Sequence, residues 1–375
     1  MNLYIHVPFC ASRCTYCDFY TQTNKTLKQD YLQALEREME IIQATIYNGD
    51  IEHIYLGGGT PSLLSARELD TIFNKIYSTW QVLPHGEHTL EANPDDLSIE
   101  YTASIASLPI NRVSMGAQSF DNKDLKFLNR RHAAGQVYEA VDNLRHHDIT
   151  NISVDLIYGL PGQTLEMWDK NMDAVLSLDI PHISSYHLIY EEGTPMTKLL
   201  NLGKIKAIDE DISLQMFRLL IHRLKAAGYE HYEISNFAQP GAYARLNTDY
   251  WRYTPYIGLG PSAHSFYDQS RLFNVSSIQE YTRMILREDQ LPQSKEVLTV
   301  KDLFNETILT GLRTMWGINV MEIKERFGNE VYAILLKSAD KYLRQNLIKE
   351  TANHHFILTE EGIFVSDGIM SDLFM

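Results

Sequence analysis

The stretch FCASRCTYCDFY, residues 9–20, contains all three cysteines of the chain, Cys10, Cys14 and Cys17, in a Cys-x-x-x-Cys-x-x-Cys run. Three thiols spaced this closely do not suit a disulfide framework. A structural zinc site normally closes with four Cys or His ligands, and nearby His6 fits such a set poorly. A cubane iron-sulfur cluster also takes four ligands, so three thiolates would leave one iron open to a ligand from outside the chain.

The composition is that of a globular protein. The chain has 375 residues, of which 44% are hydrophobic and 22% charged, and this length favours two or three domains. The formal net charge of -15 disfavours non-specific binding to nucleic acid or anionic lipid, so we expect no nucleic-acid partner. The apolar stretches are shorter than the roughly 18 residues that a membrane span needs, and no signal-type apolar core follows the N-terminus. We therefore expect a cytoplasmic protein without a transmembrane segment.

Short β-rich runs alternate with amphipathic helical patterns along more than half of the chain. The runs that read as strands are 3–7, 53–58, 88–93, 112–117, 152–159 and 182–189. The segments that read as helices are 31–46, 65–79, 98–107, 137–144, 164–177 and 208–227. This alternation predicts parallel βα units, in which ligands bind at the carboxyl ends of the strands.

Glycines and polar residues gather at these predicted strand ends. The second run leads into GGGTPS, residues 57–62, where consecutive glycines let the backbone approach a ligand that a Cβ would obstruct. A tight turn is the alternative reading of this loop. The polar residues at or just beyond other strand ends are Glu91, Gln118, Arg130 and Asp155. Each of these, taken alone, is more often a solvated or structurally paired side chain than a ligand.

The cysteine run, with spacings of three and two residues, resembles the signature of the radical S-adenosylmethionine (SAM) superfamily. The resemblance implies a [4Fe-4S] cluster whose open iron is chelated by the amino and carboxylate groups of the methionine part of SAM. It also implies that an electron from the cluster can release methionine and a 5'-deoxyadenosyl radical. With the strand and helix pattern, the expected fold is α/β, a partial (β/α)6 radical SAM barrel.

Within that superfamily the chain resembles the oxygen-independent coproporphyrinogen III oxidase-like family. The segments that carry the resemblance are YIHVPFC, GGGTPSLL, EANP, GAQSF, DLIYGLPGQT and YIGLGPSAHS. The residues that it implies as contacts of SAM are Tyr4, Tyr16, Gly58, Gly59, Thr60, Glu91, Gln118, Arg130 and Asp155. The planar fork of Arg130 can pair with the carboxylate of the cofactor, while Asp155 and Gln118 suit ribose hydroxyls. Ordinary core packing is the alternative for the two tyrosines.

Two differences from the pattern of this family indicate which of its branches the chain resembles. The dehydrogenases of the family carry a fourth cysteine two residues after the third, where this chain has Phe19, and an N-terminal extension, whereas Cys10 here follows Met1 by nine residues. Both departures resemble the haem chaperone branch, whose members bind haem and pass it to acceptor haem proteins. The alternatives are a radical enzyme acting on a porphyrinogen or another tetrapyrrole, with an electron donor such as flavodoxin or ferredoxin, and a non-catalytic cluster-binding regulator.

One motif of the haem chaperone branch is altered. That branch usually has His-Asn-x-x-Tyr-Trp, linked with haem binding, but residues 246–251 read Leu-Asn-Thr-Asp-Tyr-Trp. Leucine cannot ligate iron, and haem normally needs an axial His, Cys, Met or Tyr. His264 and Tyr250 are therefore candidate haem ligands, with a hydrogen-bonded structural histidine as the alternative for His264. If the missing histidine matters, Leu246→His should strengthen haem binding.

The C-terminal region differs in character from the rest. An apolar stripe starts a helix at Phe304, a short helix and a third one over 330–346 follow, and a two-stranded wing turns at Ala352 and Asn353. This pattern predicts a mainly helical, winged-helix-like domain. Residues 300–375 carry 8 Lys or Arg against 11 Asp or Glu, which is the wrong sign for DNA binding, so we expect a lid or partner surface. The predicted division is a barrel with the cluster and cofactor site over 1–227, a connecting region packed beside it over 228–300, and the C-terminal domain over 301–375.

Overall fold

The computed structural model describes residues 1–375 and contains one twelve-stranded sheet and one three-stranded sheet. The strands of the large sheet are β1 Asn2–Val7, β2 Ile54–Gly58, β3 His88–Ala92, β4 Arg112–Gln118, β5 Ile152–Tyr158, β6 His182–His187, β7 Glu230–Glu233, β8 Asn236–Ala238, β9 Tyr256–Leu259, β10 His264–Tyr267, β11 Ser270–Asn274 and β12 Gln293–Val297. Their spatial order is β12-β11-β10-β9-β1-β2-β3-β4-β5-β6-β8-β7. The six predicted strands are thus confirmed as β1 to β6, each within two residues at either end.

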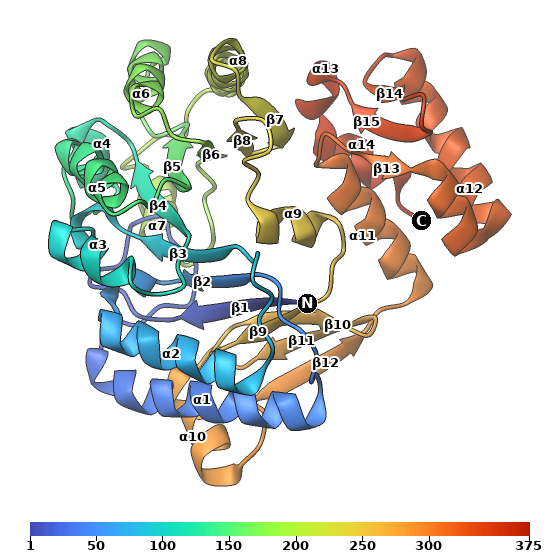
Figure 1. The fold of residues 1–375 in the computed structure, drawn as a ribbon. Coiled ribbons are helices and arrows are strands. Elements are labelled where there is room, and N and C mark those ends of the chain that lie inside the picture. Colours follow the sequence, from blue (N-terminus) through green and yellow to red (C-terminus); the bar gives the residue numbers. More distant parts are fainter.

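Strands β1 to β6 pair in parallel in the order of the sequence, with helices on their outer side (Figure 1). The helices of the first two thirds of the chain are α1 Lys28–Thr45, α2 Ala66–Thr79, α3 Ile99–Ile105, α4 Asn122–Phe127, α5 Ala134–His146, α6 Leu165–Ser177, α7 Pro195–Asn201, α8 Glu210–Ala226 and α9 Arg245–Trp251. All six predicted helices are present, and the short helices α4, α7 and α9 lie outside the predicted ranges. The α/β barrel-like architecture is therefore confirmed.

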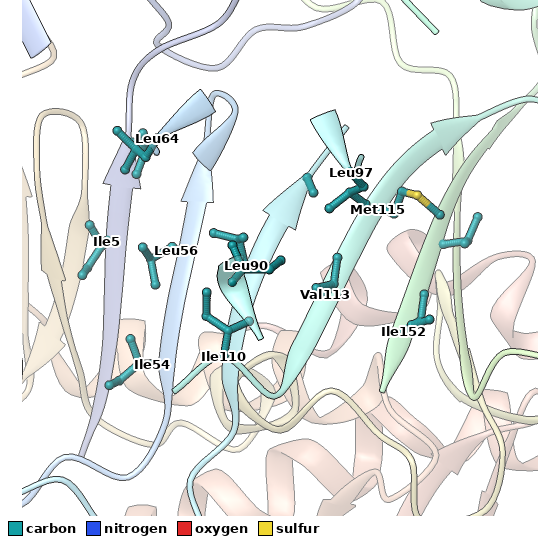
Figure 2. Packing of buried hydrophobic residues seen from close by; sticks show 14 of the residues in the cluster. Ile5, Ile54, Leu56, Leu64, Leu90, Leu97, Ile110, Val113, Met115 and Ile152 are labelled. Atoms are coloured by element: carbon teal, nitrogen blue, oxygen red, sulfur yellow. The ribbon is translucent and has the colours of Figure 1, made fainter. Parts of the chain in front are cut away.

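Alternation along the strands separates an outer apolar layer from a polar interior. Ile5, Leu56, Leu90 and Val113, from four neighbouring strands, are fully buried and belong to one apolar cluster (Figure 2). Buried residues of α1 and α2 belong to the same cluster. The strand residues that alternate with these four point the other way, because successive side chains of a strand alternate between its faces. Tyr55 accordingly donates its hydroxyl hydrogen to Glu91 Oε1 at 2.8 Å across the interior. The interior of the barrel can therefore hold polar side chains that bind a ligand, while the apolar core lies between the strands and the helices.

Residues 228–300 add strands to both edges of this parallel core. Strand β9 pairs with β1 in parallel, and β10, β11 and β12 follow it in antiparallel order, while β8 pairs antiparallel with β6 and β7 with β8. Helix α10 Ile278–Glu288 joins β11 to β12 and lies against α1. The division of the chain at residues 227 and 300 remains a prediction.

The C-terminal region has a separate apolar cluster of 13 buried residues. Its elements are α11 Val300–Leu312, β13 Ile318–Asn319, α12 Val320–Arg344, β14 Ile348–Glu350, β15 His355–Leu358, α13 Glu360–Ile363 and α14 Ser366–Leu373. Gly328, with φ of 89°, divides α12 into two helical parts, and β14 and β15 form the predicted wing with its turn at residues 352–353. Ion pairs of Arg218 with Glu361 and of Arg313 with Glu233, both at 3.0 Å, join this region to the rest.

None of the helices combines the length and the apolar character needed to cross a membrane.

A buried carboxylate holds the extended part of the sheet against helix α1. Glu38 is fully buried and accepts hydrogen bonds from the Tyr281 hydroxyl at 2.6 Å, the Gly260 N–H at 2.8 Å and the Asn274 side-chain amide at 2.7 Å. Burial raises the pKa of Glu38 to about 7, against the opposing effect of these three donors. One side chain thereby connects α1 with α10 and with the ends of β9 and β11.

We expect Glu38 to make stability depend on pH, and Glu38→Gln to remove that dependence. The folded state keeps a proton up to about pH 7 that the unfolded chain releases near its usual pKa. The contribution of Glu38 to stability is therefore full below the unfolded pKa and is lost as the pH rises through the folded one. The unfolding free energy of wild type relative to Glu38→Gln should fall by on the order of 3 kcal/mol between pH 4 and pH 8. Denaturant unfolding at several pH values measures it, and parallel pH profiles would contradict it.

Candidate cofactor site

The predicted site residues converge because parallel strands end at one edge of the sheet. Val7 pairs with Gly58, Ala92 with Met115, and Gly116 with Asp155, so the loops that follow these strands meet. They surround a cavity of about 460 Å³. The predicted residues that line it are Cys10, Cys14, Cys17, Tyr16, Gly58, Gly59, Thr60, Glu91, Gln118, Arg130 and Asp155.

The cysteine loop is held by backbone hydrogen bonds at its start and in its middle. Cys10 N donates to Gln22 O at 2.9 Å, and Thr15 N donates to Leu128 O at 3.2 Å. The three cysteines are free thiols, and burial raises the pKa of Cys10 and raises that of Cys17 to about 11. No three His, Cys, Asp or Glu side chains stand close enough to hold one metal ion. In a cubane each thiolate binds a different iron, so cluster binding needs no such convergence.

The glycine loop lies directly against the start of the cysteine loop. A Cβ on Gly59 would come within 2.7 Å of Phe9 O and 2.9 Å of Val7 O, and a Cβ on Gly58 would meet the His6 ring at 2.6 Å. Gly58 also has φ of 105°, which L side chains rarely adopt. These glycines are therefore required by packing against neighbouring protein atoms, in addition to any approach to a ligand.

Two half-buried carboxylates face the cavity from β3 and β5. Glu91 accepts from the Tyr55 hydroxyl at 2.8 Å and from Gly58 N at 3.0 Å, and burial raises its pKa to about 7. Asp155 lies 3.4 Å from the Ser114 hydroxyl, and burial raises its pKa also. Each carboxylate retains acceptor capacity beyond these bonds, which suits hydroxyl or ammonium groups of a ligand.

Arg130 joins the cysteine loop to the ends of β3 and β4. Its Nη1 donates to Cys14 Sγ at 3.4 Å, and its Nη2 donates to Gly116 O at 2.5 Å and to the side-chain oxygen of Asn93. Its Nε is buried without any partner. This guanidinium is half-buried, bonds no carboxylate and leaves one buried N–H without a partner, so it fits the carboxylate of a bound amino acid.

Three predicted residues lie outside the cavity. The Tyr4 hydroxyl bonds His6 Nδ1 at 3.1 Å, the Tyr250 ring packs edge-on against Tyr256 at 4.5 Å, and His264 lies exposed beside Phe273. None of the three lines the cavity. The roles proposed for them from the sequence are therefore not supported by direct access to it.

Some cavity residues were not singled out from the sequence. Asn93 connects Thr60 Oγ1, at 3.3 Å, with the guanidinium of Arg130, and Tyr186 faces the cavity from the end of β6. Asn93 lies within the EANP segment and could have been found from its place after a strand. Tyr186 carries no such signal, because nothing in its sequence context distinguishes it from a core tyrosine.

Comparison with known proteins agrees with this geometry. The model of the radical SAM superfamily matches residues 4–175, and that of the HemN C-terminal domain matches residues 298–365. The chain is 32% identical to "Heme chaperone HemW" of Lactococcus lactis over 98% of its own length and 96% of that protein. The chain belongs to the HemW-like family of radical SAM proteins.

Other matches extend over the full length of the chain as well. Its identity to the HemW of Bacillus subtilis is 32%, over 96% of each protein. The structure titled coproporphyrinogen III oxidase (HemN) from Escherichia coli superposes with a TM-score of 0.85, covers 100% of this chain and 90% of that one, and is 21% identical. This structural likeness confirms the predicted fold.

Radical SAM proteins use a [4Fe-4S] cluster and SAM, and the cavity of this HemW-like chain fits both. The three cysteines would hold the cluster, while Arg130, Glu91 and Asp155 would bind the charged and hydroxyl groups of SAM. The bound pair supplies one-electron reductive cleavage of a sulfonium. The chain itself contributes a half-buried cation, Arg130, next to Cys14, and two carboxylates whose pKa values are raised.

We expect the three cysteines together to bind one oxygen-sensitive cluster, because they are the only thiols of the chain and line one cavity. Anaerobic reconstitution should give about four irons and four sulfides per chain, and Cys14→Ala should lose most of this iron. Ser12→Ala is the matched control, since it lies in the same loop and removes no thiol. Tightly held zinc in place of iron, or unchanged iron in Cys14→Ala, would contradict the assignment.

We expect Arg130→Ala to weaken SAM binding at least tenfold, because a buried carboxylate would lose its charged partner at a cost of about 2 to 4 kcal/mol. Equilibrium dialysis with labelled SAM measures the affinity, and iron analysis verifies that the cluster is retained. Arg131→Ala is the control, because that guanidinium pairs with Asp95 and Asp96. If wild type and Arg130→Ala bound SAM with equal affinity, Arg130 would not be a SAM-binding residue.

Proposed function

We propose that this protein is a cytoplasmic haem chaperone that binds haem and transfers it to acceptor haem proteins. The observation that carries the proposal is similarity along the whole chain to several proteins named haem chaperones. In addition to the relatives above, it is 31% identical to "Heme chaperone HemW" of Mycobacterium tuberculosis over 99% of its own length. Both the barrel and the C-terminal region are thus shared with those proteins.

The second residue after the cysteine run supports the chaperone over the enzyme. Phe19 occupies the position at which the resembling dehydrogenases carry a fourth cysteine, and its side chain is 60% exposed at the cavity. An apolar, exposed side chain there offers contact area to an apolar ligand and no thiol chemistry. We take the retained cluster and SAM to serve haem handling in a structural or regulatory way.

A second function is favoured by one specific observation. The cavity brings together three thiols, Arg130 with its unpartnered Nε, and two carboxylates whose pKa is raised. A radical enzyme acting on a porphyrinogen would use the same site and would need an electron donor such as flavodoxin or ferredoxin. This activity is the alternative that the assay below separates from haem transfer.

The C-terminal region is the part that we assign to partners. It is acidic and is held to the barrel by ion pairs and by stacking of Arg218 on Phe364 and of Arg313 on Trp251. Phe217 also packs edge-on against Phe364, and Glu233 forms an antiparallel backbone bridge with Thr314, so aromatic and backbone contacts join the region to the barrel as well. We propose that acceptor haem proteins contact this region.

A paired assay distinguishes the two functions. We expect the reconstituted protein to bind haem stoichiometrically and to pass it to an apo haem protein, seen as the absorbance spectrum of the acceptor. We expect no increase in 5'-deoxyadenosine when coproporphyrinogen III is added with reductant, because Phe19 replaces the fourth cysteine. Multiple turnover with porphyrinogen would establish the enzyme, and failure to bind haem would reject the chaperone.

A further inference from the structure

Three large apolar side chains are exposed together at the mouth of the cofactor cavity. Phe19 is 60% exposed, Ile189 is 65% exposed and Tyr186 is 43% exposed, and all three line the cavity. Large apolar side chains are mostly buried in a folded chain, and a group of them around one opening marks a binding surface. We call these three residues the apolar mouth.

The apolar mouth is continuous with a buried apolar floor. Ile157 and Leu188 line the same cavity and belong to a small cluster of buried apolar residues beneath it. The glycine loop, the two carboxylates and Arg130 line the same cavity. The lining therefore combines polar groups that suit SAM with apolar side chains that suit a second, apolar ligand.

One rim cation is free to meet an acidic group. Arg13 lines the cavity, and its guanidinium donates only to Cys17 O, at 3.3 Å. The other rim arginine, Arg131, is already paired with Asp95 at 2.9 Å and Asp96 at 2.8 Å. Asp18 and Glu191 also line the cavity and would repel an anion, so a ligand with carboxylates would turn them towards Arg13.

The altered motif of residues 246–251 offers no comparable opening. Leu246 in α9 is 2% exposed, Tyr250 packs against Tyr256, and Trp251 lies under the guanidinium of Arg313. The helix is tied to the amino ends of the strands, because Glu87 accepts from Arg245 N at 2.9 Å and Asp249 accepts from Asn2 at 2.7 Å. A planar ligand could reach Leu246 only after this helix left its place.

We propose that the apolar mouth is the haem-docking surface of this protein, with the macrocycle against Phe19, Tyr186 and Ile189 and its propionates towards Arg13. The inference rests on the proposed haem chaperone function and specifies where that function occurs. It fits the chemistry of haem, an apolar plane with two carboxylates at one edge. It also places haem and SAM in adjoining parts of one cavity.

The test is a haem titration of the full-length, cluster-loaded protein, followed by absorbance under anaerobic conditions. The double variant Phe19→Ser/Ile189→Ser should bind haem at least tenfold more weakly than wild type, with unchanged iron content and melting temperature. The matched control is Val297→Ser/Val300→Ser, because these side chains are 69% and 63% exposed and do not line the cavity. The control should bind haem as wild type does.

The outcomes separate this inference from the function on which it rests. If wild type binds no haem, both the proposed function and the docking surface are wrong. If wild type binds haem and the Phe19/Ile189 variant binds it within twofold, the function stands and the docking surface is wrong. A loss confined to the Val297/Val300 variant would also reject the apolar mouth, because Val300 lines a different cavity, between residues 253–269 and the C-terminal helices.

Discussion

The parallel pairing of β1 with β2 is the constraint on which the site depends. It sets Val7 opposite Gly58, so the cysteine loop and the glycine loop leave the sheet at the same level and in contact. Gly59 lies so close to Phe9 O and Val7 O that no larger residue fits. Arg130 then connects this pair of loops to the ends of β3 and β4 through Cys14, Asn93 and Gly116. The strand register and the packing of the two loops fix the positions of the residues that line the resulting cavity. A cluster and a small zwitterion can therefore bind there together.

Much of this arrangement could be predicted from the sequence. The strands β1 to β6 read clearly because their outward residues are buried beneath helices, and the cysteine spacing is specific for its chemistry. Glu91, near the end of β3, was found because parallel strands gather their carboxyl ends. Asp155 lies in the middle of β5, not at its end as predicted, and lines the cavity from there. The strands within 228–300 were not predicted, since they are short and several, such as β12, are mostly exposed.

The residues that prediction placed poorly share one physical reason. Tyr4, Tyr250 and His264 carry chemically suitable groups, but each contacts another side chain of the protein instead of lining the cavity. The spacing of residues in the sequence does not reveal these contacts. The apolar mouth is the opposite case. Phe19, Tyr186 and Ile189 carry no group that suggests a function in the sequence, and they matter only because all three are exposed at one cavity. A site of this kind, built from loops far apart in the sequence, appears only when the fold is known.

The central claim is that one cavity holds the cluster, SAM and haem. An anomalous difference map at the iron absorption edge, from crystals of the haem-loaded protein, tests it most directly. We expect one strong peak at Cys10, Cys14 and Cys17 and a second, single-iron peak between Phe19 and Ile189. A second peak beside α9, or between residues 253–269 and the C-terminal helices, would contradict it.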